Sequence, residues 1–197
     1  MNYEKASKNK VSLIMAAFNE EESIKGAIES VLNQKYTKFD LIVINDGSED
    51  KTKEIIESMY EEDCKVRLIN QRNRGLAYSL NKAIKVSKSE FIARLDADDR
   101  CLPGRFEKQV SFLRQNEKVG VVGSDYLRID DIRDKNHIRG YPKKDKKIRR
   151  AMSKYIPIAH SSVMFRRRAV VEVGGYNESL SDHEDLDLWI RVAKNWK

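Results

Sequence analysis

The sequence is short of several residue types and patterns that define whole classes of protein. Its two cysteines, Cys64 and Cys101, lack CxxC spacing, which argues against a disulfide framework or a zinc site and favours a reducing compartment. No apolar run approaches the roughly 20 residues of a transmembrane helix. The apolar run at 11–18 is broken by Asn19 and three glutamates, so it is no signal peptide. We therefore expect a cytoplasmic protein.

Internal repeats and low-complexity tracts are also missing. The composition that is present, 40% hydrophobic and 35% charged over 197 residues, is typical of one well-cored globular domain. The net charge of +7 suits nucleic acid, an anionic membrane surface or small anions, and composition does not choose among them. Because we find neither a recognition-helix motif nor an aromatic stacking platform, no nucleic-acid partner is predicted.

Short apolar runs alternate with amphipathic segments in the first half of the chain. We expect strands over 11–17, 40–46, 65–70 and 90–96, and helices over 19–34, 50–62, 75–87 and 102–116. Asn19 is the expected N-cap of the first helix, with carboxylates in its first turn. The alternation predicts an α/β fold with an open, mostly parallel sheet flanked by helices, whose ligands bind at the carboxyl ends of the strands.

The second half of the chain is less regular. We expect strands over 119–124 and 161–167, a short helix over 168–173, and a last helix over 182–196. Residues 125–152 alternate poorly and are strongly basic from Arg133 onward. They predict a hairpin or a mobile loop that ends in a short helix near 145–153.

Polar residues follow the second and third expected strands. Asp46 comes directly after "LIVIN", and Gly47 permits a tight turn; this carboxylate can accept hydrogen bonds from a base or ribose, or simply belong to a capped turn. Arg74 and Gly75 precede a helix N-terminus. That arrangement attracts phosphate, and a solvated basic turn is the alternative.

Three carboxylates, Asp96, Asp98 and Asp99, follow the fourth expected strand. As capping residues alone they would repel one another without compensation. A divalent cation removes this objection, because Mg²⁺ and Mn²⁺ prefer oxygen ligands and often share them with substrate phosphates. The stretch therefore predicts a metal site, with the ion as a Lewis acid for a departing diphosphate.

A second acidic group, "SDHEDLD", opens the last expected helix. The helix dipole favours acids there, so a capping cluster is one interpretation, and presentation of Asp185 as a proton acceptor is the other. His160, in "IPIAHSS", is interpreted either as a ligand contact or as a packed residue.

Taken together, these segments resemble the inverting glycosyltransferases of family 2, which have the GT-A fold. The likeness covers nearly the whole chain. It runs in order through "VSLIMAAFNEEESIKGAIESVLNQ", the nucleotide-binding turn "LIVINDGSEDKT", "NRGLAYSLNKAI", the DXD segment "FIARLDADDRCLPGRFEKQ" and the ED motif "HEDLDLWIR".

The resemblance implies a role for each matching residue. Asp46 matches the residue that reads a uracil-type base, Phe18 the aromatic lying against that base, and Asp96 a contact near the ribose. Asp98 matches the direct ligand of Mn²⁺ or Mg²⁺, and Asp185 the general base. The other site residues expected are Asn19 and Arg74 on the nucleotide, with Gly47, Gly75, Asp99, His160 and Glu184 in support.

The resemblance also implies the reaction and its partners. A sugar passes from a nucleoside-diphosphate sugar, with UDP as the expected carrier, to a hydroxyl of a glycan or lipid-linked acceptor, with inversion, in bacterial surface polysaccharide or glycolipid synthesis. Residues 1–99 would form the nucleotide-binding half of a single GT-A domain and 100–197 the acceptor-side half. Family members commonly continue past the ED helix, so the chain is interpreted as a truncated or minimal member.

Two alternative functions, and the role of one basic segment, stay open at this point. A nucleotidyltransferase uses a similar nucleotide-binding half, but it would normally have a Gly-rich phosphate signature near the first strand, and "AAFNEEES" has none. A sugar-nucleotide-binding module without catalysis would use the same residues. The basic stretch from Arg133 to Arg150 is interpreted either as a docking segment for anionic lipid at the inner face of the membrane or as a solvated loop.

Overall fold

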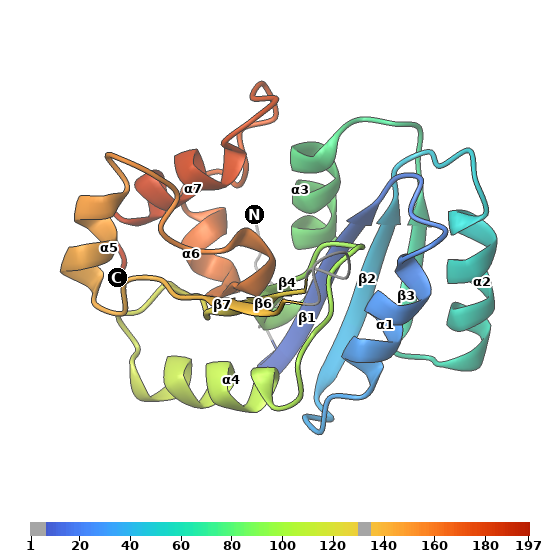
Figure 1. Ribbon diagram of the computed structural model, residues 1–197, viewed down its shortest axis with the longest axis horizontal. Helices are drawn as coiled ribbons and strands as arrows, with labels where there is room; N and C mark the ends of the chain where they lie inside the picture. Colours follow the sequence, from blue (N-terminus) through green and yellow to red (C-terminus); the bar gives the residue numbers. More distant parts are fainter. Residues whose placement is uncertain (1–6, 130–134) are drawn as a thin grey trace.

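A six-stranded sheet forms the middle layer of the computed structural model, which describes residues 7–129 and 135–197 (Figure 1). The first four strands are parallel, and the other two add an antiparallel edge. The order across the sheet is β3 (Val66–Asn70), β2 (Phe39–Asn45), β1 (Ser7–Ala17), β4 (Ser89–Arg94), β8 (Met164–Arg166) and β5 (Val121–Val122). The mostly parallel α/β sheet predicted from the sequence is confirmed.

Helices cover both faces of this sheet, because the central strands are apolar on both sides. One core joins Leu13 and Met15 of β1 to α1 (Ile24–Leu32), α2 (Thr52–Glu62) and α4 (Arg105–Gln115). The other joins Ile14 of β1 and Phe165 of β8 to α3 (Leu76–Val86), α6 (Arg167–Val171) and α7 (Glu184–Val192). In the part of the chain that the structure describes, no helix is long and apolar enough to cross a membrane.

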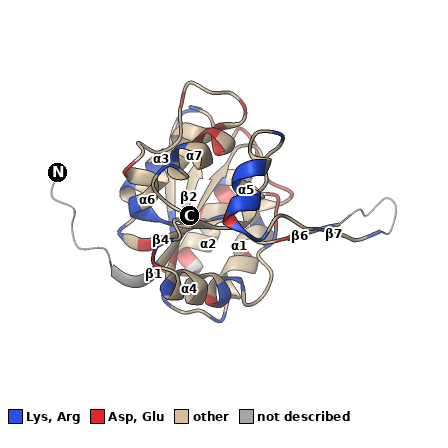
Figure 2. Cartoon of the chain, turned by 90° about the vertical axis from the view of Figure 1, so that its left-hand side faces the viewer, with Lys and Arg blue, Asp and Glu red and all other residues tan. Residues whose placement is uncertain are grey.

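The segment 125–152, for which the sequence predicts a hairpin or a mobile loop, contains a hairpin. Strands β6 (Tyr126–Arg128) and β7 (His137–Arg139) pair with each other and extend away from the rest of the molecule (Figure 2). The predicted short helix follows as α5 (Asp145–Ala151), and a 3-10 turn, η1 (His160–Ser162), precedes a β8 shorter than expected. Residues 130–134, with which the basic stretch begins, lie outside the described part.

The prediction that Asn19 caps the first helix is wrong. Helix α1 begins at Ile24, with Ser23 at the N-cap position and no acid in its first turn. Asn19 instead adopts a left-handed conformation (φ 56°), which asparagine tolerates better than most residues. Its side-chain oxygen accepts a hydrogen bond from the backbone N–H of Glu49 (2.9 Å), so it ties the exit of β1 to the exit of β2.

Helix α4 supplies a matched pair of phenylalanines for testing the core. Phe106 is fully buried and meets Phe39 edge-on at 5.5 Å between ring centroids, whereas Phe112 is 45% exposed. We expect Phe106→Ala to lower the free energy of unfolding by about 3–5 kcal/mol, because it leaves a cavity. Phe112→Ala, measured alongside by chemical denaturation, should cost much less. Equal losses would contradict this packing.

Candidate active site

The polar residues that follow the parallel strands all lie at one edge of the sheet. Ala17, Asn45 and Asn70, the last residues of β1, β2 and β3, lie in register with one another. The following loops therefore emerge side by side, and β4 adds the loop that carries Asp96. This is the edge at which open α/β sheets bind ligands.

Asp46 organises the loop that follows β3. Its Oδ1 accepts hydrogen bonds from Gln71 Nε2 (2.7 Å) and the Arg74 backbone N–H (2.9 Å), and its Oδ2 accepts one from the Gly75 N–H (2.8 Å). The Asp46 residue is 4% exposed, so these donors compensate a charge that would otherwise be costly to bury. Of the four lone-pair positions of a carboxylate, these bonds leave one on Oδ2.

Gly47 and Gly75, in the loops after β2 and β3, adopt backbone conformations that favour glycine. Gly47 has φ +80°, and a Cβ added there would lie 2.7 Å from the backbone nitrogen of Asn73. Gly75 has φ +85° directly before α3. The loops after β2 and β3 therefore approach each other closely, and a side chain at Gly47 would separate them.

Two large side chains line the open side of the same edge. Phe18 follows β1 and is 45% exposed, which leaves its ring available for stacking on a flat ligand. The guanidinium of Arg74 lies 4.2 Å from the centre of the Tyr78 ring, a cation–π contact that orients this exposed positive charge, while the backbone N–H of Arg74 binds Asp46. The structure thus brings together Phe18, Asn19, Asp46 and Arg74, as predicted for the nucleotide side.

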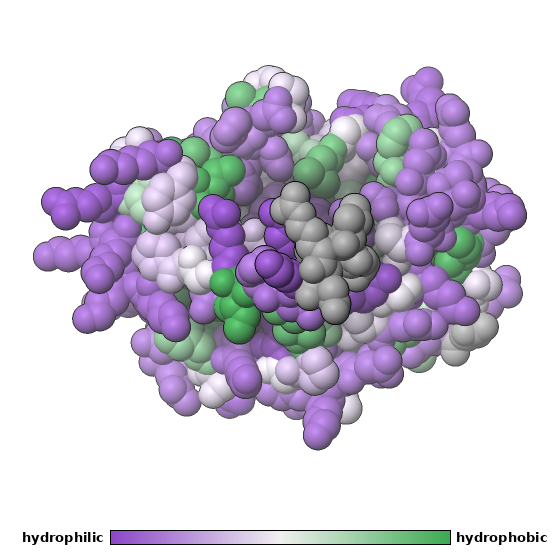
Figure 3. All heavy atoms as spheres, in the orientation of Figure 1, coloured by the Kyte–Doolittle hydropathy of each residue, from purple (hydrophilic) through white to green (hydrophobic). Residues whose placement is uncertain are grey.

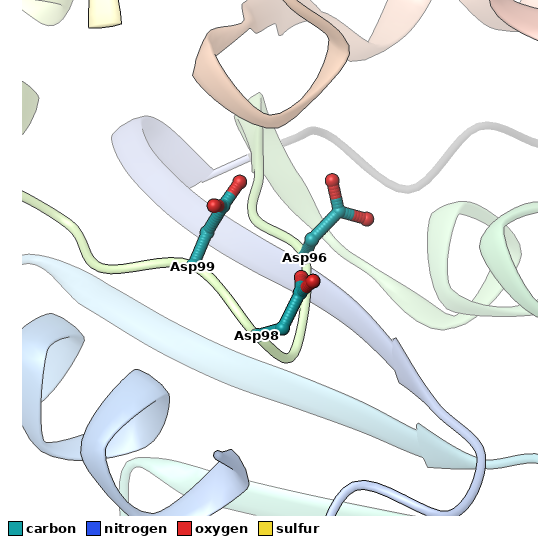
Figure 4. A group of neighbouring side chains, drawn as sticks. All are labelled: Asp96, Asp98 and Asp99. Atoms are coloured by element: carbon teal, nitrogen blue, oxygen red, sulfur yellow. The ribbon is translucent and has the colours of Figure 1, made fainter. Parts of the chain in front are cut away.

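The three carboxylates after β4 point to the same side of their loop (Figure 4). Oxygen atoms of Asp96, Asp98 and Asp99 lie within 4.8 Å of one another, and Asp98 and Asp99 are exposed. An all-oxygen donor set of this kind is the one that Mg²⁺ and Mn²⁺ prefer. The residues present therefore fit a divalent ion.

Arg94, at the end of β4, supplies a counter-charge that the sequence reasoning missed. It is 2% exposed, and both of its terminal nitrogens bind the Asp96 carboxylate. Burial raises the pKa of the Asp96 carboxyl, and the guanidinium limits that rise. The expectation that the three carboxylates lack compensation unless a divalent metal ion is bound is thus wrong for Asp96, which is paired with Arg94. Among the described residues, Arg94 Nε has no hydrogen-bond partner, which leaves a buried donor for a ligand or water.

A second group of acids lies at the start of α7, near enough to Arg94 for its charge to act on them. Asp185 is 6% exposed, and its Oδ1 accepts a hydrogen bond from the Leu186 N–H (2.7 Å). Burial raises the pKa values of both Asp185 and Glu184, and the positive charge of Arg94 opposes both rises. Carboxylates with raised pKa values are better proton acceptors, which suits the predicted role of Asp185.

His160 lies beside these acids. Its Nδ1 is 3.7 Å from Glu184 Oε1, and its Nε2 is 2.8 Å from the Tyr176 hydroxyl. Burial and then the nearby charge of Arg94 lower the pKa of His160 well below its usual value, so the imidazole is neutral at pH 7. The ring also packs against Trp189, so His160 is a packed residue at the wall of the site.

Several residues that complete the site carried no sequence signal. Ser161 Oγ accepts a hydrogen bond from the Asp96 N–H (3.0 Å), which connects the carboxylate loop to the segment of His160. The backbone of Tyr176 is held by the Asn81 side chain of α3 through two hydrogen bonds, of 2.8 and 2.9 Å. Both contacts join residues more than 60 positions apart, so no local pattern indicates them.

Comparison with known families fits this arrangement. Residues 12–175 match Glycosyl transferase family 2. EpsE of Bacillus subtilis (strain 168) is 35% identical over 188 residues, a span covering 92% of this chain and 66% of EpsE. The O-antigen biosynthesis glycosyltransferase WbnJ of Escherichia coli is 30% identical over 187 residues, covering 92% of this chain and 71% of WbnJ. The chain belongs to glycosyl transferase family 2.

Solved structures share the fold at low sequence identity. Mannosyltransferase PcManGT from Pyrobaculum calidifontis, in complex with GDP-Man and Mn²⁺, superposes with a TM-score of 0.74 at 18% identity, over 95% of this chain and 53% of that one. TarS 1-349 of S. aureus in complex with UDP-GlcNAc gives a TM-score of 0.75 at 20% identity, over 94% of this chain and 54% of that one. The predicted GT-A fold is confirmed.

The chain spans only part of its relatives. It covers 66% of EpsE and 65% of an uncharacterized glycosyltransferase, MJ1057, of Methanocaldococcus jannaschii. The family match ends at Gly175, before the acidic start of α7. The predicted roles of individual site residues, Asp185 among them, therefore stay predictions.

The buried neutral His160 predicts a loss of stability in weak acid. Its pKa in the folded state is depressed, so only the unfolded state takes up a proton as the pH falls below about 6.5, the usual histidine value. Between pH 7 and 5.5 this uptake should cost about 1 kcal/mol of unfolding free energy. Denaturation at several pH values should show that loss.

Two variants isolate the contribution of His160 from that of the nearby acids. His160→Gln should remove the loss, whereas His137→Gln, which changes an exposed histidine of β7, should keep it. An unchanged pH dependence in His160→Gln would contradict burial as the cause.

Proposed function

We propose that this chain transfers a sugar from a nucleoside-diphosphate sugar to an acceptor hydroxyl by a single displacement with inversion. The observation that carries the proposal is that two acidic groups share one buried arginine. Both terminal nitrogens of Arg94 bind Asp96, and the positive charge of Arg94 also acts on Asp185 and Glu184. One group suits a departing diphosphate and the other suits an attacking hydroxyl.

On the donor side, the residues described above form a nucleotide site. We place the base against Phe18, with its N–H on the remaining acceptor position of Asp46, the ribose near Asp96, and the phosphates within reach of Arg74. Uridine is the expected base. TarS, of the same fold, binds UDP-GlcNAc, whereas PcManGT binds GDP-Man. Residues 1–99 would thus hold the donor and 100–197 the acceptor.

The carboxylate loop would hold Mn²⁺ or Mg²⁺ through Asp98, with Asp99 in support. When bound, such an ion stabilises negative charge on a leaving diphosphate. The task of the chain's own residues is to keep Asp96 and Asp98 on the same side of the loop. The Ser161 and Arg94 contacts of Asp96 do this.

On the acceptor side, Asp185 takes the proton of the attacking hydroxyl. Its Oδ1 is occupied by the Leu186 N–H, so Oδ2 is the receiving atom. The oxygen of the acceptor forms a bond to the anomeric carbon while the bond from that carbon to the diphosphate breaks, which inverts the configuration. We expect the acceptor to be a glycan or lipid-linked sugar of a surface polysaccharide. This expectation is supported by two relatives named for polymer synthesis, the O-antigen biosynthesis glycosyltransferase WbnJ and the amylovoran biosynthesis glycosyltransferase AmsE of Erwinia amylovora.

Asp185→Asn tests the proposed base. Because the amide cannot accept the proton, the rate of transfer should fall by ~10²–10⁴, while donor affinity stays unchanged. Release of nucleoside diphosphate from a UDP-sugar donor, in the presence of Mn²⁺ and acceptor glycans, measures the rate, and calorimetry measures donor binding. Release of pyrophosphate by the unaltered chain would instead indicate a nucleotidyltransferase.

The matched control for this variant is Asp182→Asn, which changes an exposed aspartate of the same segment and should leave the rate unaltered. Full activity in Asp185→Asn would remove Asp185 from the role of base.

Asp98→Asn tests the proposed metal ligand. A ligand that binds the folded state raises the melting temperature, so UDP with Mn²⁺ should stabilise the unaltered chain more than UDP with a chelator does. This difference should disappear in Asp98→Asn and persist in Asp63→Asn, a turn aspartate between α2 and β3. A metal-dependent shift that survives in Asp98→Asn would place the ion elsewhere.

A further inference from the structure

The whole net positive charge of this chain comes from one short segment. Residues 135–154 contain nine Lys or Arg and one Asp, a net charge of +8, whereas the chain as a whole carries +7. The other 177 residues together carry −1. The segment comprises β7, α5 and the residues that join them, so the charge is gathered on one side of the fold (Figure 2).

Most of these cations face solvent. Lys146, Lys147 and Arg150 of α5 are exposed, as is Lys144 directly before it, and hydrophilic side chains project from the side of the molecule where α5 lies (Figure 3). Among the described residues, ion pairs in this segment join only Lys143 to Asp125 and Arg149 to Asp145. The outward face of α5 is therefore a field of largely uncompensated positive charge.

The inward face of α5 is apolar, which fixes the basic face outward. Ile148 and Met152 line a pocket of about 520 Å³ together with Trp189 and Trp196. Arg149 also holds the helix to the end of the chain, because its Nη2 donates a hydrogen bond to the Trp196 carbonyl (2.6 Å). The helix is thus anchored to the body of the protein and presents its lysines as a rigid set.

Exposed apolar side chains lie next to this charge on the hairpin. Leu127 and Ile138 pair directly across β6 and β7, so they share one face of the hairpin. They are 39% and 77% exposed, and Ile129, just beyond β6, is 61% exposed. A projecting apolar pair beside a basic helix is the combination that binds the interface of an anionic bilayer, with charge on the headgroups and apolar side chains among the acyl chains.

We propose that α5 and the β6–β7 hairpin form a docking surface for a membrane containing anionic lipid. Charge complementarity to the lipid headgroups and the exposed Leu127–Ile138 pair favour this partner. Nucleic acid would satisfy the charge but offers no apolar phase for these two side chains. None of the surface residues belongs to the candidate active site, so docking is independent of the proposed transfer and is measured separately from it.

Vesicle sedimentation with the whole chain tests the surface. The chain should bind vesicles of phosphatidylcholine mixed with phosphatidylglycerol, should not bind phosphatidylcholine alone, and should dissociate at high salt. Neutralising Lys144, Lys146, Lys147 and Arg150 to Gln should weaken binding on the order of a hundredfold. Leu127→Ser combined with Ile138→Ser should weaken binding at low salt, although it leaves the charge of the surface unchanged.

A matched control removes the same charge elsewhere. Lys25, Lys51, Lys85 and Lys108 are exposed and lie outside the segment; changing them to Gln should leave vesicle binding within a fewfold of the unaltered chain. Thermal unfolding checks that each variant is folded. Any one of three results would overturn the proposal. The first is equal weakening by the two sets of Gln substitutions, and the second is a lack of binding to anionic vesicles. The third is displacement of the vesicles by an equal charge of duplex DNA.

Discussion

The site depends on one buried cation, the guanidinium of Arg94. Placing a charge at 2% exposure at the end of a central strand is costly unless it is paired, and Asp96 pairs with it through both terminal nitrogens. The same charge opposes the pKa rises of Asp185 and Glu184, and it adds to the effect of burial, which is the main cause of the lowered pKa of His160. The two acidic groups therefore share one counter-charge, which the end of β4 supplies.

The two acidic groups are positioned by different kinds of interaction. Asp46 and Asp96 follow strands whose ends are fixed by backbone hydrogen bonds, so the register of the sheet places them. Asp185 is placed by the packing of α7, whose Leu188 and Trp189 are buried in the second core. The geometry of the acids at the strand exits thus follows from sheet pairing, whereas the position of Asp185 follows from side-chain packing between distant segments, which is more sensitive to substitution.

This difference explains what the sequence could predict. The alternation of apolar runs and amphipathic segments located the parallel strands and their helices, and the acids at the strand exits followed from that order. Arg94 escaped notice because a single polar residue inside "FIARLD" looks like part of a buried strand, and its partner becomes evident only when the loop is folded. The capping role given to Asn19 failed for a related reason. Its side chain bonds across to the loop after β2, and helix periodicity carries no sign of that contact.

The charge of this chain is divided between two places: the candidate active site is acidic, and the proposed docking surface of α5 and the hairpin is basic. Because residues 135–154 carry +8, the sheet edge with its acids belongs to a remainder of net charge −1, although the whole chain is basic. A diphosphate approaching Asp96, Asp98 and Asp99 is repelled unless a cation accompanies it, so the basic segment does not replace a metal ion at that edge. A field confined to α5 and the hairpin acts within about a Debye length of roughly 8 Å at physiological salt. In the proposed docking this field would therefore orient the molecule at an anionic surface, while in the proposed transfer the acidic edge would take a metal-bound donor.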